Sequence, residues 1–224
     1  MASIVATLLA AGTLRTVFGI ECNIDLTARG YPLCFQACEM WCWATVIGSF
    51  EEYYSNRALL RDDPFGPVTP KCRGYECHVV SDTMGAECCS SANHTPGGCL
   101  TGAKPCGEGA APEQIAGELQ RRVPSAGAWR YVHDAELPDE EAFVHILSSG
   151  NPIGTLHSGH INAVVGCRTT ANGTEYRLVD SLGPFPADGM WLPSYSDLMK
   201  TPWAPEAAVR GIIYAAAPVE TVVV

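Results

Sequence analysis

Three cysteines spaced four apart, Cys34, Cys38 and Cys42, occupy the segment CFQACEMWCWA. Cysteines in such a cluster can ligate a metal, form disulfides or act as nucleophiles. A nucleophilic thiolate is stabilised by the first turn of a helix, whose free N–H groups attract negative charge. Pro32 and an irregular lead-in predict that the helix begins only near Trp41 or Cys42. We therefore expect Cys42 to be a free, reactive thiol and Cys34 and Cys38 to be oxidised. From composition alone, Cys42 would instead be interpreted as a buried core cysteine or as one partner of a disulfide bond.

A nucleophilic cysteine needs a base, a group that orients the base, and donors for the oxyanion of its tetrahedral intermediate. Residues 159–166, GHINAVVG, predict an apolar strand with His160 at its start, and Asp180 ends the next predicted strand, YRLVD. Antiparallel strands joined by a hairpin can bring such residues side by side. We predict Cys42 as nucleophile, His160 as general base and acid, and Asp180 as the residue that orients it. Gln36, six residues before Cys42, is the candidate oxyanion donor, and its alternative is an ordinary surface glutamine.

Other residues compete for these roles. His157 is the alternative base, and because an odd offset along a strand places side chains on opposite faces, we expect at most one histidine to face the site. Asn162 shares the predicted face of His160 and either helps to orient it or is an ordinary polar strand residue. Asp180 also suits a turn before Ser-Leu-Gly-Pro, in which case Asp188 is the alternative orienting residue.

The elements that would position these residues are predicted as helices first and strands afterwards. Apolar residues recurring at intervals of three and four, or a proline followed by acidic residues, mark the helices. The expected helices span 41–60, begin at 112, and span 138–150; the expected strands span 152–157, 160–168, 175–182 and 209–216, with a hairpin turn at 170–173. These elements predict an α+β fold in which a helical N-terminal half packs against an antiparallel sheet.

The eleven cysteines are the strongest compositional signal in the chain. Six of them lie within residues 62–111, a stretch rich in glycine and proline where apolar periodicity is lost. We expect an irregular loop region held by disulfides, because so few apolar residues could not order it alone. The spacings there lack the Cys-x2-Cys pairs of structural zinc sites, so we favour disulfides over zinc. Cys167, away from the cluster, either stays unpaired or pairs with Cys22.

The length and net charge of the chain limit the classes of protein to which it can belong. With 224 residues, 47% of them hydrophobic, the chain suits one globular domain, which we place at 20–224. Its formal net charge of −10 and its scattered basic residues argue against a nucleic-acid partner or an anionic membrane surface. An uncharged apolar start and the cysteine content predict a signal peptide at 1–19 and secretion, or residence in the secretory pathway. We expect a monomer.

The combination of motifs resembles the papain-like cysteine peptidases. It looks most like a compact bacterial-type branch that includes effector peptidases of plant pathogens. In that branch a Trp-Cys-Trp-Ala segment, here 41–44, is followed by a double cysteine, here 88–89. The Gly-His strand and the acidic residue after a hairpin also match, and the resemblance spans roughly residues 31–200. The family's late strand often ends in Asp-Pro, whereas here Asp180 is followed by Ser181.

The resemblance implies a papain-like fold, in which the helix that carries Cys42 packs against a sheet that carries His160 and Asp180. It implies that Gln36 and the backbone N–H of Cys42 form the oxyanion hole. It further implies hydrolysis of peptide bonds in a peptide or protein substrate, through a thioester and without a cofactor or metal. Two alternatives stay open. One is a transglutaminase-like acyl transferase with the same triad, and the other is an inactive, disulfide-rich binding or effector module.

Overall fold

The computed structural model describes residues 21–36, 38, 40–55, 75–88, 104–182, 189–200 and 208–216. Its elements in chain order are β1 (Asn23–Asp25), α1 (Cys42–Ser55), α2 (Tyr75–Met84), α3 (Pro112–Arg122), β2 (Ala128–His133), α4 (Glu140–Ser148), β3 (Ile153–His157), β4 (His160–Thr170), β5 (Gly173–Val179), β6 (Met190–Leu192), α5 (Tyr195–Leu198) and β7 (Gly211–Ala216). The predicted signal peptide lies outside the described residues.

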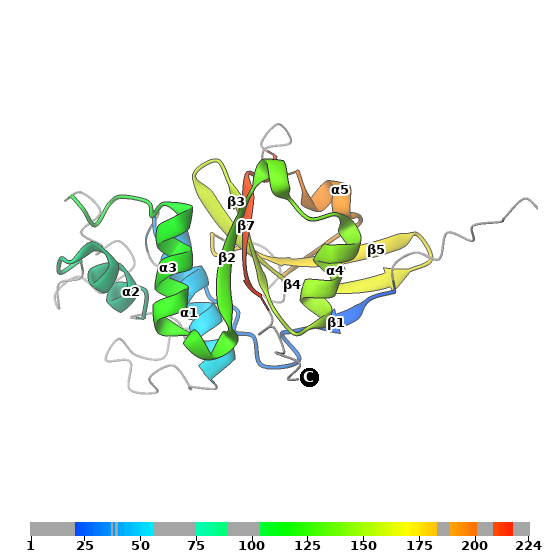
Figure 1. Ribbon diagram of the computed structural model, residues 1–224, viewed down its shortest axis with the longest axis horizontal. Coiled ribbons are helices and arrows are strands. Elements are labelled where there is room, and N and C mark those ends of the chain that lie inside the picture. Colours follow the sequence, from blue (N-terminus) through cyan, green and yellow to red (C-terminus); the bar gives the residue numbers. More distant parts are fainter. Residues whose placement is uncertain are drawn as a thin grey trace, which may run out of the picture.

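One antiparallel sheet forms the centre of the fold. Its strands run in the order β2-β7-β3-β4-β5-β6, and β1 pairs with β4 as well. Figure 1 shows α1, α2 and α3 grouped beside one end of the sheet, and α4 and α5 beside the other. The predicted α+β class with an antiparallel sheet is therefore confirmed.

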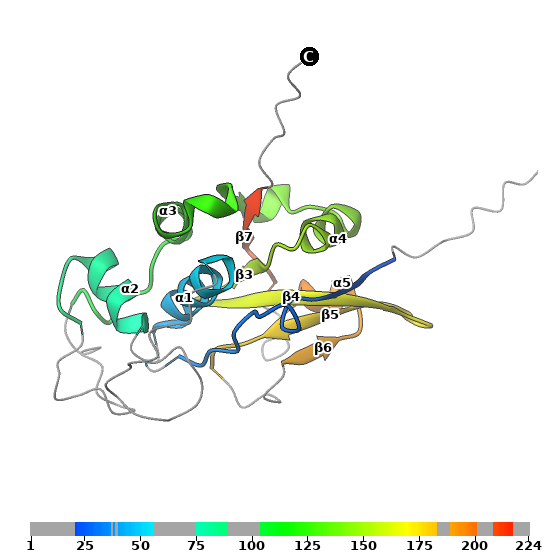
Figure 2. The same cartoon turned by 90° about the horizontal axis from the view of Figure 1, so that it is seen from below.

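Apolar side chains cover both faces of the central strands. Alternate residues of β4 point to opposite faces. Ile161, Ala163 and Val165 therefore join the core formed with α1 and α3, whereas Val164 joins the core formed with α4. Because both faces of β4 are covered, residues 161–167 are all buried, and all of them except Asn162 are apolar or glycine. Figure 2 shows α1 and α4 at two separate positions along the sheet.

Helix α1 is built around an apolar stripe with the predicted spacing of three and four. The buried members of this stripe are Trp43, Val46, Ile47 and Phe50. Phe50 stacks on Trp129 of β2, with ring centroids 5.6 Å apart. The helix begins at Cys42, as predicted. Its predicted end near Leu60 lies outside the described residues.

The stretch 62–111 was predicted to be irregular, and this prediction is wrong for α2. Val79 and Val80 of α2 are fully buried in the core that α1 shares. Glu76 accepts a hydrogen bond from Thr45 Oγ1 of α1 at 2.8 Å. Packing against a neighbouring helix thus orders a segment whose own periodicity is too weak to identify it as a helix.

The sequence does not predict β1, β2, β6 or α5. Strands β1 and β6 have three residues each and α5 has four, too few to show a period. The strands depend on partners distant in the chain: β1 pairs with β4, β6 with β5, and β2 with β7. Such pairing is visible only once the sheet is assembled.

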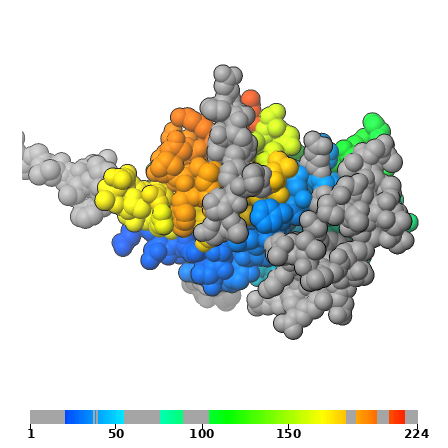
Figure 3. Space-filling model, turned by 180° about the vertical axis from the view of Figure 1, so that it is seen from behind, coloured from blue at the N-terminus to red at the C-terminus, as the bar shows by residue number. Residues whose placement is uncertain are grey.

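Two disulfides have both partners among the described residues. Cys22, beside β1, is bonded to Cys167 of β4, and Cys88 is bonded to Cys106. Of the two alternatives for Cys167, pairing with Cys22 is therefore the one found. Figure 3 shows the segment that carries β1 lying along the β4–β5 hairpin, where the first of these bonds fastens it.

Within the described ranges, no helix is both long enough and apolar enough to cross a membrane. The same part of the chain holds no group of three or more His, Cys, Asp or Glu side chains placed to bind a metal ion.

Candidate active site

Cys42 is the first residue of α1, at the helix end whose backbone N–H groups lack partners within the helix. Its side chain is buried, and it is the free cysteine of the described part of the chain. Cys34 and Cys38 are both disulfide-bonded. The prediction of one free thiol beside two oxidised neighbours is confirmed. The turn before the helix is closed by a hydrogen bond from the Trp41 N–H to the Cys38 carbonyl, at 3.0 Å.

His160 opens β4 and Asp180 directly follows β5, and the pairing of these strands brings the two side chains together. His160 Nε2 lies 2.9 Å from Asp180 Oδ1. The same oxygen accepts a hydrogen bond from the Leu182 N–H at 2.7 Å. The side chain of Asp180 is only 3% exposed, so the carboxylate is held in place and shielded from water. The alternative residue Asp188 lies outside the described residues.

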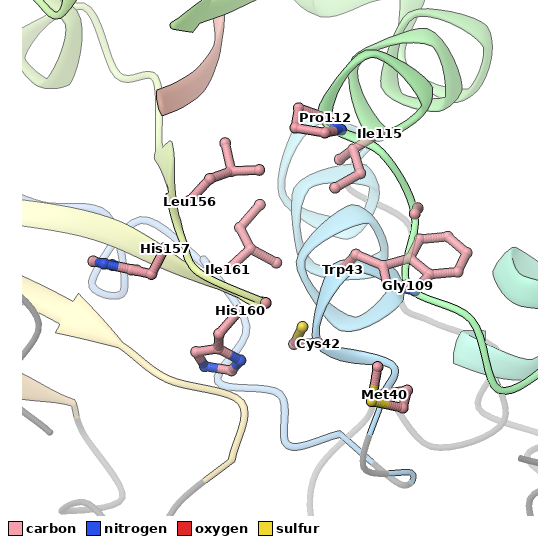
Figure 4. A pocket seen from close by; sticks show the side chains of 12 residues that line it. Met40, Cys42, Trp43, Gly109, Pro112, Ile115, Leu156, His157, His160 and Ile161 are labelled. Atoms are coloured by element: carbon pink, nitrogen blue, oxygen red, sulfur yellow. The ribbon is translucent and has the colours of Figure 1, made fainter. Parts of the chain in front are cut away.

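The Cys42 sulfur lies close enough to the imidazole of His160 to affect its pKa. Figure 4 shows the sulfur at the start of α1 facing the ring. Burial by itself lowers the pKa of His160, because it penalises the charged ring. The hydrogen bonds and charges of Asp180 and Cys42 oppose burial and outweigh it, which raises the pKa of His160 to about 10. At neutral pH the ring is therefore protonated, between a carboxylate and a sulfur.

His157 and His160 share a face of the β3–β4 hairpin, so the expectation that they point to opposite faces is wrong. Opposite faces follow from an odd offset only within one strand. Here Ser158 and Gly159 form a turn between the two histidines, which are register partners, and register partners share a face. The ring of His157 points away from Cys42 in Figure 4, so His160 is the histidine next to the sulfur.

Gln36 is fixed to the residue that follows Asp180. Its backbone N–H donates to the Ser181 carbonyl at 2.9 Å, and its Oε1 accepts from the Ser181 hydroxyl at 2.7 Å. Its Nε2 donates to the Cys38 carbonyl at 2.9 Å. The loop before α1 is thereby tied to the end of β5. Ser181 belongs to no motif in the sequence, and its only signal is its place directly after Asp180.

A cavity of about 190 Å³ opens beside Cys42, between the α1–α3 side and the β3–β4 hairpin. Its apolar walls are formed by Met40, Trp43, Pro112, Ile115, Leu156 and Ile161. Figure 4 shows Leu156 and Ile161 directed from the strands toward α3. These wall residues come from separate elements, so no local pattern in the sequence could have grouped them.

Neither a protein-family model nor a curated protein matches this chain. The chemistry of the site is therefore inferred from its own geometry.

Proposed function

We propose that this protein is a cysteine peptidase that hydrolyses peptide bonds through a thioester on Cys42. The observation that carries the proposal is that His160 lies beside the Cys42 sulfur and hydrogen-bonds with Asp180, with the thiol at a helix N-terminus. Reactive cysteine thiols are found at helix N-termini and next to histidines, whereas purely structural cysteines are unreactive. The proposal includes a papain-like fold with a disulfide-rich insertion at 62–111, and secretion, with which the disulfides agree.

In the proposed reaction, His160 holds the proton of the Cys42 thiol, so the sulfur attacks the carbonyl carbon of the scissile peptide bond as a thiolate, and the carbonyl oxygen becomes negatively charged. His160 donates its proton to the amide nitrogen, the C–N bond breaks, and the amine leaves while a thioester remains. His160 then removes a proton from a water molecule that attacks the thioester. The acid product leaves and the thiol is restored. Asp180 keeps the ring oriented through both halves of the reaction.

The oxyanion donors in this proposal are the backbone N–H of Cys42 and the side-chain amide of Gln36. Backbone N–H groups in the first turn of a helix lack partners within the helix and are suited to bind an anion. The two hydrogen bonds between Gln36 and Ser181 support the second donor, because a donor fixed in advance needs little reorganisation when charge develops.

The cavity beside Cys42 favours a substrate with an apolar side chain close to the scissile bond. A volume of about 190 Å³ suits one aliphatic or aromatic side chain and is smaller than the cavities that hold drug-sized molecules. Leu156 and Ile161 would contact that side chain from the strands, and Ile115 from α3.

Hydrolysis of a mixed peptide library tests the proposal, under conditions that keep the disulfides. The wild type should cleave next to or near apolar residues. Cys42→Ser and His160→Asn should each lose roughly four or more orders of magnitude in kcat. His145→Asn, on the exposed face of α4, is the matched control and should retain activity. Cleavage that persists in Cys42→Ser would overturn the assignment.

The same triad can pass its acyl group to an amine instead of water. A primary amine added to the assay separates these outcomes, because incorporated amine and released acid can be measured together. If amine incorporation exceeds hydrolysis, the protein is an acyl transferase. If neither product forms although Cys42 is alkylatable, the protein is a binding module.

A further inference from the structure

The face of the sheet that carries His160 shows three successive rows of side chains across β3, β4 and β5. The first row is the apolar set Ile153, Val164 and Leu178, which are register partners. The second row is Thr155, Asn162 and Asp180, and the third contains His157 and His160. Thr155 and Asn162 are register partners, and the pairing of Ala163 with Val179 sets Asn162 beside Asp180 where the ladder ends. A polar row thus separates the apolar core from the histidines.

The polar row contains side chains that are buried without hydrogen-bond partners. Thr155 and Asn162 are both 0% exposed. Among the described residues, Thr155 Oγ1 has no hydrogen-bond partner, and neither Oδ1 nor Nδ2 of Asn162 has one. Buried polar atoms in this state lower stability, and valine or leucine at these two positions would avoid the cost. A stability cost located next to a reactive centre is typical of a residue with a functional role.

We propose that Asn162 is a positioning residue for the Asp180 carboxylate, an inference that rests on the proposed function. His160 and Leu182 both bond to Asp180 Oδ1, so the carboxylate still offers Oδ2 as an acceptor. Asn162 Nδ2 donates toward this oxygen in the working site, and the Thr155 hydroxyl donates to Asn162 Oδ1. Each donor then meets one acceptor.

The proposed hydrogen bond from Asn162 to Asp180 affects the reaction through the orientation of His160. A carboxylate held at both oxygens cannot rotate away from the imidazole, so the ring keeps its orientation while its proton moves to the leaving amine. Among the described residues, the titratable groups in these three rows are Asp180, His157 and His160, with Cys42 facing His160 from α1 and Tyr176 and Tyr214 farther along the same face. Changing Asn162 to an apolar residue alters the charge of none of them, so its effect is one of orientation.

Asn162→Leu tests the inference. We expect kcat/KM to fall about tenfold to a hundredfold, mainly through kcat, because a hydrogen bond to a charged group is lost. We expect the melting temperature to stay the same or to rise, because unpaired buried polar atoms are removed. The step in the pH profile of Cys42 alkylation that reports deprotonation of His160 should move to lower pH, because a less well-held carboxylate stabilises the protonated ring less. A purely structural role would leave that step unmoved.

The double variant Thr155→Val/Asn162→Leu provides a second test, since it leaves no polar atom of either side chain unpaired and is expected to fold at least as well as the wild type. It should show the same loss in kcat as the single variant. A folded variant with wild-type kcat/KM and an unchanged alkylation profile would overturn the inference. So would an activity loss that only follows the fraction of unfolded protein.

The peptidase proposal and the positioning role of Asn162 can each be overturned without the other. If the wild type shows no Cys42-dependent hydrolysis, the peptidase proposal is wrong, but alkylation of Cys42 still reports on His160. Identical alkylation profiles for the wild type and Asn162→Leu would then overturn the positioning role by itself, and a shifted profile would support it.

Discussion

Asp180 influences the candidate site through its hydrogen bond to His160, and its charge adds to that effect. Its carboxylate contacts His160 and contributes to raising the pKa of that ring from an ordinary value of 6.5 to about 10. A ring that stays protonated through the neutral range can supply the proton that the leaving amine needs. The pH dependence of the reaction should therefore depend on this one contact.

Asp180→Asn keeps the shape of the side chain and removes its charge. The pKa of His160 should then fall toward its ordinary value. Since the reaction needs the protonated ring, the alkaline limb of kcat/KM should move to lower pH, and kcat should fall roughly a hundredfold to ten-thousandfold. A pH–rate profile measures both effects. Asp82→Asn, exposed on α2, is the control and should leave the limb in place. An unmoved limb in Asp180→Asn would contradict the role given to its charge.

The placement of Cys42, His160 and Asp180 could be predicted because each depends on a local signal. A helix start places the thiol, and one hairpin brings the other two residues together. The shared face of His157 and His160 does not follow from their odd offset, because the turn at Ser158 and Gly159 puts them on two different strands. Ser181 and the cavity walls could not be predicted, because their contacts arise only when separate elements pack.

At the scale of elements, β4 links the site to the rest of the fold. It carries His160 at one end and Cys167 near the other, and it pairs with β1, β3 and β5. Seven residues separate His160 from Cys167, which is roughly 20 Å along a strand. The disulfide to Cys22 therefore fastens β4 at a distance from the chemistry.

Removing this disulfide with Cys22→Ser/Cys167→Ser should lower stability and spare the reaction. The closed loop spans 145 residues, so a loss of roughly 2–5 kcal/mol is expected. Urea unfolding measures this loss, and kcat is measured well below the new melting temperature. Loss of kcat in protein that remains folded would show that β1 has a closer connection to the site than its position indicates.

Two glycines give opposite predictions for the same substitution. A Cβ at Gly166 would lie 2.5 Å from the Ile24 carbonyl of β1, so Gly166→Ala should cost roughly 1–3 kcal/mol. Gly117, exposed within α3, has nothing within 4 Å of such a Cβ, so Gly117→Ala should gain roughly 0.5–1 kcal/mol. Urea midpoints measured side by side test both. Similar shifts for the two variants would contradict the close packing of β1 on β4.

The elements that could be predicted are those that carry their own pattern. Helix α1 and strands β3, β4, β5 and β7 have enough buried residues to show a period or an apolar run. Helix α2 and strands β1 and β6 are defined by neighbours distant in the chain, and the sequence of each alone resembles a loop.

At the scale of the whole molecule, the candidate site lies where two apolar cores meet. Cys42 belongs to the core formed with α1 and α3, whereas Asp180 follows a strand whose Leu178 belongs to the core formed with α4. Contacts between distant segments keep these parts in register. Gln36 bonds to Ser181, and the Trp41 indole N–H donates to the Cys106 carbonyl at 2.9 Å. The geometry of the site therefore depends on how the whole domain is held together.

Reduction should affect this domain in two stages, since the free thiol and the disulfides respond to different strengths of reductant. Mild reductant keeps Cys42 reduced and should preserve hydrolysis. Stronger reductant should open the bonds at Cys34 and Cys38, on either side of Gln36, and the loop that holds the oxyanion donor would lose its covalent support. Hydrolysis should then fall while Cys42 stays alkylatable.

Activity and cysteine-specific mass labelling, measured on the same samples, follow both events. Full turnover after Cys34 and Cys38 have become alkylatable would show that the disulfides hold the fold without supporting the chemistry.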